Sequence, residues 1–384
     1  MQTRFSDEAK HLPRAEEAER ILRSCVHCGF CNATCPTYQL LGDELDGPRG
    51  RIYLIKQVLE GQPATASTQL HLDRCLSCRN CETTCPSGVD YHNLLDIGRA
   101  VVDQAVPRPA GQRALRLGLR SLATSPERFK ALLRLGTVFR PLLPTTLATK
   151  LPHPSPPHGE RPPLRHRRTV LMLEGCVQPG LSPNTNASAA RVLDRLGVSV
   201  IPCAQAGCCG ALDYHLDAQA SGLDRARQNI DAWWPHLENG AEAIVQTASG
   251  CGAFIKDYGH LLEHDPGYAA KAKQISERAL DLVQVLGKEP LEQICAARNQ
   301  RIAVHCPCTL QHAQKLGGSI EALLTRLGFN LTEVPDGHLC CGSAGTYSLT
   351  QPALARQLRD NRLNALESGQ PELIVTANVG CQNH

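Results

Sequence analysis

The sequence predicts an α+β protein of several domains, in which a helical N-terminal domain precedes two repeated α/β domains with parallel sheets. Two compact cysteine clusters lie before residue 105, and the stretch between them carries apolar residues at helical spacing. After residue 168 an internal repeat begins, and short apolar strands alternate with helices in each copy. These observations divide the chain into four regions: 1–105, 106–168, 169–300 and 301–384.

The composition excludes several classes of protein. Of 384 residues, 42% are hydrophobic and 20% are charged, which is typical of a soluble chain with ordinary cores. Aromatic residues make up only 4% and the net charge is +3, so we expect no nucleic-acid partner. No run of about 20 uncharged apolar residues predicts a membrane-spanning helix. The first eight residues lack the apolar run of a secretory signal, so we expect a cytoplasmic protein.

Cysteine is the most informative residue type, with 19 in the chain. A reducing cytosol keeps structural disulfides rare, so cysteines at this density predict metal ligands or redox groups. Eight of them form two runs, Cys25-x2-Cys28-x2-Cys31-x3-Cys35-Pro36 and Cys75-x2-Cys78-x2-Cys81-x3-Cys85-Pro86.

Both runs match the spacing of bacterial ferredoxins, in which three thiolates bind one iron–sulfur cube and the fourth reaches across to the other. The spacing therefore predicts two [4Fe–4S] clusters: the first bound by Cys25, Cys28, Cys31 and Cys85, the second by Cys75, Cys78, Cys81 and Cys35. Zinc sites also use Cys-x2-Cys and are the alternative. Residues 48–59 have helical periodicity, so we expect a helical two-cluster ferredoxin domain that transfers single electrons.

The region 106–168 is a basic connector without cysteine, and it carries thirteen Lys/Arg against two acids. Residues 151–163 form a proline-rich tether. Segments 115–120 and 129–135 predict basic helices that could lie on an anionic membrane or on a partner. A helical face packed against the protein's own domains is the alternative interpretation.

The repeat after residue 168 consists of four corresponding segments. The first copy contains Val170–Cys176, Arg195–Val198, Gly207–Gly210 and Ile244–Cys251. The second copy contains Ile302–Cys308, Arg326–Phe329, Leu339–Gly342 and Ile374–Cys381. In both copies 31 residues separate the first cysteine from the Cys-Cys pair, which indicates two α/β domains of the same design.

We expect the repeated cysteines to lie on turns that follow strands. Parallel strands bring such turns to one edge of the sheet, so the cysteines of each copy should converge. Gly210 and Gly342 follow the two Cys-Cys pairs and allow the backbone to curl there. The converging cysteines could hold a further cluster or metal or act as redox thiols, and buried small residues are the alternative. They are Cys176, Cys208, Cys209, Cys251, Cys308, Cys340, Cys341 and Cys381.

Three further cysteines, Cys203, Cys295 and Cys306, have no counterpart in the other copy. We expect them to be core or surface thiols. Cys306 draws interest because it lies beside His305 and two residues before Cys308. His305 itself is more often a polar residue satisfied by hydrogen bonds than a ligand.

Over nearly its full length the chain resembles the family of glycolate oxidase (glycolate dehydrogenase) iron–sulfur subunits. The segments that carry the resemblance are Cys25–Tyr38, Asp46–Arg51 and His305–His312. The resemblance implies an electron-transfer subunit that is not catalytic alone. Its partners would be an FAD-containing subunit that oxidises glycolate to glyoxylate, with D-lactate as a lesser substrate, and a second flavin-type subunit. It also implies a peripheral location on the cytoplasmic face of the inner membrane and a respiratory-chain acceptor.

The broader pattern is shared with heterodisulfide reductase subunits and with the iron–sulfur subunit of anaerobic glycerol-3-phosphate dehydrogenase. The heterodisulfide reductase pattern ends each cysteine-rich domain with Cys-x2-Cys. Here Gly-Ala-Phe254 follows Cys251 and Gln-Asn-His384 follows Cys381, so both copies lack the fifth thiol. This departure argues against a cluster of the heterodisulfide type.

Several functions remain open at this point. No Gly-x-Gly-x-x-Gly motif follows a predicted strand, so we expect any flavin to be bound only by partner subunits. The alternatives are a glycerol-3-phosphate dehydrogenase subunit and a thiol–disulfide reductase that works at the Cys-Cys-Gly sites. A zinc-built interaction protein is a third.

Overall fold

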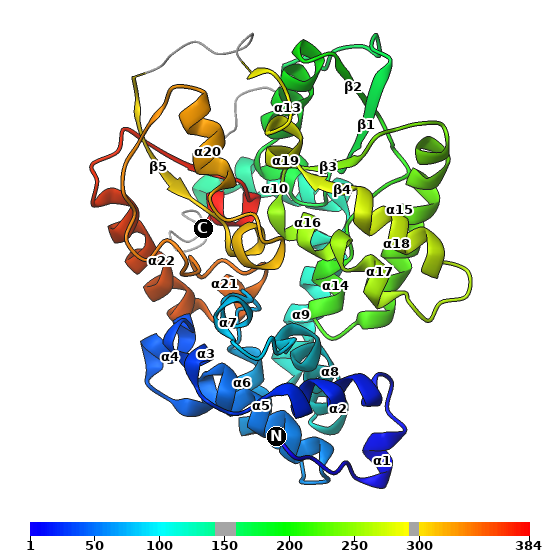
Figure 1. Cartoon of the computed structure of the whole chain (residues 1–384), viewed down its shortest axis with the longest axis vertical. Coiled ribbons are helices and arrows are strands. Elements are labelled where there is room, and N and C mark those ends of the chain that lie inside the picture. Colours follow the sequence, from blue (N-terminus) through cyan, green and yellow to red (C-terminus); the bar gives the residue numbers. More distant parts are fainter. Residues whose placement is uncertain (143–158, 292–298) are drawn as a thin grey trace.

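The computed structural model describes residues 1–142, 159–291 and 299–384, and it has the α+β architecture expected from the sequence. A helical N-terminal part lies at the bottom of Figure 1, and two units built on parallel sheets lie above it. The fold class is confirmed, whereas the domain boundaries near residues 105, 168 and 300 remain predictions. Cys295 and much of the proline-rich tether lie outside the described residues.

Helices alone build the N-terminal part. They are α1 (Asp7–Lys10), α2 (Ala15–Ser24), α3 (Phe30–Ala33), α4 (Pro36–Leu41), η1 (Glu44–Asp46), α5 (Pro48–Leu59), α6 (Ala66–Asp73), α7 (Asn80–Thr84) and α8 (Tyr91–Ala105). Helices α2, α5 and α8 enclose a core in which Ile21, Ile55 and Leu94 are almost completely buried. Pro36 and Pro48 begin α4 and α5, where a proline loses no helical hydrogen bond.

A buried ion pair lies at the start of α5. The side chains of Arg51 and Asp46 are both 0% exposed, and Arg51 Nη2 lies 3.4 Å from Asp46 Oδ1. Arg51 also donates to His71 O at 2.7 Å and to Thr37 Oγ1 at 3.2 Å. Arg74 pairs with the second oxygen of Asp46 at 2.9 Å. Buried charges of this kind are tolerated because every charged group has partners.

The same network reaches both cysteine runs. Thr37 Oγ1 donates to Asp46 O at 2.8 Å and lies 3.3 Å from Cys35 Sγ. The carbonyl of His71 belongs to α6, which ends just before Cys75. Arg51 therefore ties α4, which follows the first run, to α6, which leads into the second.

The basic connector packs against acidic residues of its own chain. It contains α9 (Ala110–Ala123), α10 (Pro126–Val138) and η2 (Arg140–Leu142). Arg108 and Arg116 both pair with Asp73 of the N-terminal part and with Asp217 of the first sheet unit. These ion pairs favour the interpretation in which the connector is fastened to the protein's own domains.

The first sheet unit has four parallel strands in the order β2-β1-β3-β4. Its strands are β1 (Arg168–Met172), β2 (Val198–Ile201), β3 (Ile244–Gln246) and β4 (Ala279–Asp281). Its helices are α12 (Gln178–Leu181), α13 (Asn184–Arg195), α14 (Ala211–His215), α15 (Gln219–Glu238), α16 (Ser249–Lys256), α17 (Tyr258–Leu261), α18 (Ala269–Arg278) and α19 (Leu282–Leu286). Leu171 packs with residues of α15, α16 and α18, while Val170 packs with residues of α13 and α19. Both faces of the sheet are therefore covered, as in doubly wound folds.

The second sheet unit is smaller, with three parallel strands in the order β6-β5-β7. Its elements are β5 (Arg301–His305), η4 (Thr309–Ala313), α20 (Ser319–Arg326), β6 (Asn330–Leu331), α21 (Tyr347–Thr350), α22 (Pro352–Glu367), β7 (Leu373–Thr376) and α23 (Val379–Gln382). Strand β5 lies between its neighbours as β1 does in the first unit. The first cysteine of each copy therefore follows a strand that has a partner on both sides.

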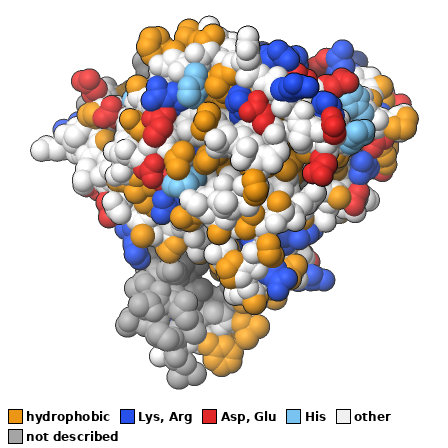
Figure 2. Space-filling model, turned by 90° about the horizontal axis from the view of Figure 1, so that it is seen from below, with side chains coloured by type: hydrophobic (Ala, Val, Ile, Leu, Met, Phe, Trp, Pro, Cys, Tyr) orange, Lys and Arg blue, Asp and Glu red, His pale blue; other side chains and the backbone are white. Residues whose placement is uncertain are grey.

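The surface agrees with the small net charge. Figure 2 shows basic and acidic side chains interspersed on one face of the molecule. Within the described ranges, no helix is long and apolar enough to cross a bilayer.

Replacing Arg51 by methionine should destabilise the protein, because Asp46 would stay buried without its main counter-charge. We expect a loss of about 3 kcal/mol in the free energy of unfolding, measured by urea denaturation under anaerobic conditions. Arg23→Met is the control, since the Arg23–Glu19 pair is exposed and its loss should cost about 0.5 kcal/mol. Equal effects of the two substitutions would contradict the structural role of Arg51.

Candidate metal centres

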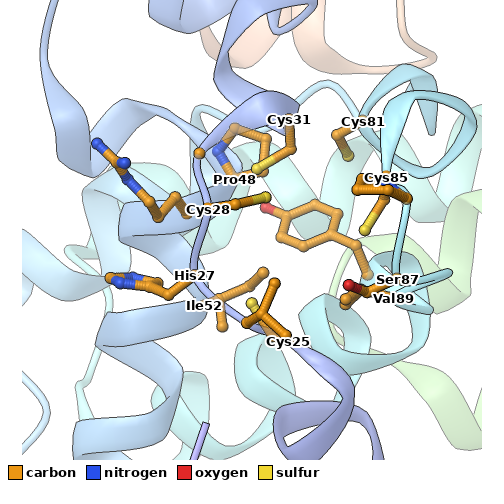
Figure 3. Close-up of a pocket in the computed structure, with 15 residues that line it drawn as sticks. Cys25, His27, Cys28, Cys31, Pro48, Ile52, Cys81, Cys85, Ser87 and Val89 are labelled. Carbon is orange, nitrogen blue, oxygen red and sulfur yellow. The ribbon is translucent and has the colours of Figure 1, made fainter.

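One cavity, called here the front cavity, collects sulfurs from both cysteine runs. It encloses about 430 Å³, its open mouth included, and its lining contains Cys25, Cys28, Cys31, Cys81 and Cys85. Figure 3 shows Cys28 and Cys31 on one side of this space and Cys81 and Cys85 on the other. Cys85 thus lies with three cysteines of the other run, where the predicted first cluster requires it.

Left-handed residues shape the loop of each run. His27 and Gly29 have φ values of 60° and 87°, and Ser77 and Arg79 at the same positions of the second run have 51° and 59°. Residues other than glycine adopt such values uncommonly, and they persist where the surrounding structure requires them. The two loops therefore reverse in the same way between successive cysteines.

The thiols of the front cavity affect one another. Burial, together with the neighbouring sulfurs of Cys25 and Cys85, raises the pKa of Cys31 to about 11. Burial also raises the pKa of Cys25. Thiolates gathered in this way need a bound cation, and an all-sulfur donor set suits iron–sulfur clusters or zinc. The residues present therefore fit the clusters that the spacing predicts.

The second front set consists of Cys35, Cys75, Cys78 and Cys81. Burial raises the pKa of Cys78 and Cys81 well above the ordinary value, and the sulfurs of Cys75 and Cys35 act on both. The hydroxyl of Tyr91 donates to Cys75 Sγ at 3.6 Å, and the same side chain lines the front cavity. Tyr91 therefore adjoins both sets. Cys81 is influenced by Cys78, Cys75 and Cys35 and also lines the front cavity.

The first sheet site comprises Cys176, Cys208, Cys209 and Cys251. Two hydrogen bonds fix the backbone of the Cys-Cys turn. Asn229 Nδ2 donates to Cys208 O at 2.9 Å, and Tyr258 Oη donates to Cys209 O at 2.5 Å. Cys176 and Cys251 line a cavity of about 280 Å³, which is closed in part by Val379 of the second unit. The two sheet units therefore meet beside this site.

The glycines after the Cys-Cys pairs make the curl that the sequence predicts. Gly210 and Gly342 have φ values of 98° and 87°. A Cβ atom would lie 2.5 Å from Gly222 O in the first unit and 2.7 Å from Ala355 O in the second. Any larger residue would collide with the backbone of α15 or α22, so both pairs depend on glycine.

The second sheet site comprises Cys308, Cys340, Cys341 and Cys381. Cys308 Sγ lies 3.8 Å from Cys340 Sγ. The possible ligand atoms of His305, Cys341 and Cys381 all lie within 4.8 Å of one another. Hydrogen bonds from Cys340 and Cys381, with a further one from His305, hold the pKa of Cys341 well below its usual range.

The sheet sites differ from the sequence expectation in one detail, and the cysteines without a repeat partner agree with it where they are described. Cys251 and Cys381 lie in the first turns of α16 and α23 rather than on turns, because these helices begin almost directly after their strands. Cys203 and Cys306 are buried core thiols, and burial raises the pKa of Cys306 to about 12. Cys306 packs in an apolar cluster with Leu310, although the charge of Cys308 contributes to its raised pKa.

The second front set adjoins the second sheet site. Leu76 and Cys78 share one buried cluster with Cys340 and Tyr347, and Cys308 packs at its edge. After burial, the charge of the Cys308 thiolate is the largest influence that raises the pKa of Cys78. Sulfurs of the N-terminal part and of the second sheet unit are therefore neighbours.

Polar residues that the sequence did not single out fasten this contact. Asn80 Nδ2 donates to Thr34 O at 3.0 Å and to His338 O at 3.1 Å. His312 lies on the π-helical η4, with Nδ1 3.0 Å from Thr83 Oγ1 and Nε2 3.0 Å from His338 O. The only sequence signal for this contact is that His312 ends the segment His305–His312.

Comparison with known families gives two kinds of match. The 4Fe-4S dicluster domain family matches residues 21–89, and the cysteine-rich domain family matches residues 170–256 and 302–384. The matched ranges contain all eight front cysteines and all eight cysteines of the sheet sites.

Curated relatives match over most of the chain. The glycolate oxidase iron–sulfur subunit of Escherichia coli K12 is 67% identical over 384 residues, covering 100% of this chain and 94% of the relative. A probable glycolate oxidase iron–sulfur subunit of Bacillus subtilis 168 is 30% identical and covers 96% and 88%. Lactate utilization protein A of Bacillus velezensis is 29% identical over 221 residues, or 55% of this chain and 88% of the relative.

Serine substitutions test how the two front sets are divided. Cys85→Ser should remove the signal of the set that contains Cys25, whereas Cys35→Ser should remove the signal of the set that contains Cys78. Each variant should lose about four irons, because one thiolate in four is missing. Iron analysis with EPR of the reduced protein checks this expectation. The exchanged result, in which Cys85→Ser removes the signal of the set that contains Cys78 and Cys35→Ser removes that of the set that contains Cys25, would show that the fourth cysteines do not cross over.

Proposed function

Because the chain belongs to the family of glycolate oxidase iron–sulfur subunits, we propose that it carries electrons for a flavin-dependent glycolate dehydrogenase. In this proposal a partner subunit with FAD oxidises glycolate to glyoxylate, or D-lactate less well, and a second flavin-type subunit completes the complex. The chain passes the electrons toward a respiratory-chain acceptor and has no catalysis of its own. The observation that carries the proposal is that five cysteines from both runs line one cavity, while the sulfurs of Cys35 and Cys75 act on Cys78 and Cys81 beside it.

The front cysteines are assigned to two [4Fe–4S] clusters in the crossed arrangement: Cys25, Cys28, Cys31 and Cys85, and Cys75, Cys78, Cys81 and Cys35. When bound, such clusters accept and release one electron each, which suits a flavin that divides an electron pair. Tyr91 supports this assignment because it donates a hydrogen bond to Cys75 Sγ of the second set and also lines the front cavity. Arg51 supports it as well, because its positive charge lies beside Cys75 and Cys35.

The first set is the end of the relay that a partner reaches. Cys28 is exposed, whereas Cys35, Cys78 and Cys81 are buried. Val26 and Phe30 flank Cys28 in the sequence and are 68% and 62% exposed. Apolar side chains at such exposure beside a redox site suit contact with the flavin subunit.

A peripheral position on the cytoplasmic face of the inner membrane completes the proposal. Among the connector's side chains, Arg116 and Arg120 are engaged in ion pairs with Asp217 and Asp213. The support comes instead from exposed apolar side chains on and just after the connector helices: Leu115, Leu117, Leu122, Leu132, Leu135, Val138 and Phe139. These side chains can enter the interfacial layer of a bilayer without a spanning helix.

The purified chain alone should not oxidise glycolate. Anaerobic mixing with glycolate should leave its visible absorption unchanged, and addition of the flavin subunits should then bleach it within the turnover time of the complex. Stopped-flow absorbance measures both steps. Bleaching by glycolate in the absence of partners would contradict the proposal, as would reduction by glycerol 3-phosphate rather than glycolate in the complete complex.

The exposed apolar pair at the first set can be tested separately. Val26→Glu combined with Phe30→Glu should slow reduction by the flavin subunit at least about tenfold, because two apolar contacts are replaced by charges that resist desolvation. Iron content should stay unchanged. Leu363→Glu is the control, since Leu363 is an exposed apolar residue of α22 in the second sheet unit. An equal rate for all three proteins would place the partner elsewhere.

A further inference from the structure

The two sheet sites are not equivalent. His305 lies three residues before Cys308 at the end of β5, and the corresponding residue of the first unit, three before Cys176, is Leu173. Leu173 is buried in the apolar core of its unit. The second site therefore has a metal-ligating side chain at a position where the first site has only a hydrocarbon.

His305 is positioned as a ligand would be. It is 4% exposed, and its Nδ1 lies 2.9 Å from Thr376 Oγ1 on the neighbouring strand β7. A ring held through Nδ1 has Nε2 available as a lone-pair donor, which is the arrangement usual for metal-bound histidines. Its ligand atom lies within 4.8 Å of those of Cys341 and Cys381.

A second, independent feature is the guanidinium of Arg362, which is 3% exposed on α22. Nη1 donates to Asp336 O at 2.7 Å, but Nε and Nη2 find no hydrogen-bond partner among the described residues. Burial lowers the pKa of Arg362, while the thiolates of Cys341 and Cys340 raise it. Buried donors of a cation without acceptors are rare and point to an anionic group at this place.

The first unit has no such cation at the corresponding place. Asn229 lies seven residues after Gly222, whose carbonyl closes on the Cys-Cys-Gly turn, as Arg362 lies seven after Ala355. Asn229 is neutral, and its amide is satisfied by Cys208 O and by the Tyr258 hydroxyl. Arg225, whose charge acts on Cys208 and Cys176, is hydrogen-bonded to Asp213 and Thr124.

The geometry points to a histidine-ligated iron–sulfur centre at the second sheet site, bound by Cys308, Cys340, Cys341, Cys381 and His305, with Arg362 as its counter-charge. His305 takes the place of the fifth thiol that both copies lack. The first sheet site, with Leu173 and Asn229 at these positions, holds no such centre. This inference goes beyond the proposed function, because it concerns a third electron site and does not depend on the substrate.

The position of the site gives it a place in the relay. Cys78 of the second front set and Cys308 are neighbours in one buried cluster, so a single electron can pass between the two sites with no bond made or broken. Exchange of thiolate for imidazole raises the reduction potential of iron–sulfur centres. The second sheet site therefore accepts electrons from the front sets rather than supplying them.

The test is EPR with nitrogen hyperfine spectroscopy on the full chain, purified anaerobically with and without ¹⁵N-labelled histidine. We expect a signal distinct from those of the front sets, with a nitrogen coupling that changes on labelling. His305→Leu should abolish the coupling and lower the iron content, and His305→Cys should restore the iron and shift the midpoint potential downward. Arg362→Gln should retain the nitrogen coupling and also lower the potential, since a positive charge is lost.

Cys306→Ala is the control, because Cys306 neighbours His305 but packs in an apolar cluster. It should leave the signal, the coupling and the potential unchanged. Zinc at this site, a third signal without nitrogen coupling, or iron unchanged by His305→Leu would each overturn the inference. The front sets are followed by their own signals, which Cys85→Ser and Cys35→Ser remove, so failure of the proposed relay remains distinguishable.

Discussion

Repulsion among buried thiolates is the constraint on which this structure depends. Sulfurs of the front sets lie so close that burial and mutual charge raise the pKa of Cys31, Cys78 and Cys81. Such groups are stable together as thiolates only around bound cations, and then they hold several loops at once. The N-terminal helices are short, and their connecting loops take left-handed turns that serve to aim sulfurs inward.

Buried arginines near the cysteines also offset the negative charge of the thiolates. Arg51 brings a positive charge to Cys75 and Cys35 while it fastens α5 to both runs. Arg362 likewise brings a positive charge to Cys340 and Cys341, although Nε and Nη2 of its guanidinium have no hydrogen-bond partner among the described residues. The connector arginines serve another purpose, since they join the N-terminal part to the first sheet unit through Asp73 and Asp217.

The spacing of residues along the chain predicts those features that depend on local geometry, namely the cysteine sets and the parallel sheets. The interval between cysteines indicated two sets of four, and alternating strands and helices indicated parallel sheets with cysteines at one edge. Contacts between segments that are distant in the sequence have no periodic pattern by which they could be predicted. They depend on how the units pack, as in the pairing of Arg116 with Asp217, the hydrogen bond between Thr83 and His312, and the contact of Cys78 with Cys308. The sequence favours His305 as a polar residue satisfied by hydrogen bonds, and one of its ring nitrogens has such a partner in Thr376.

The proposed relay requires that the eight front cysteines hold two neighbouring one-electron centres. EPR of the anaerobically purified, dithionite-reduced chain, combined with iron and acid-labile sulfide analysis, measures whether they do. We expect signals of two magnetically interacting [4Fe–4S] centres and at least about eight irons per chain. Correctly folded protein that carries zinc and shows no paramagnetic iron would contradict it.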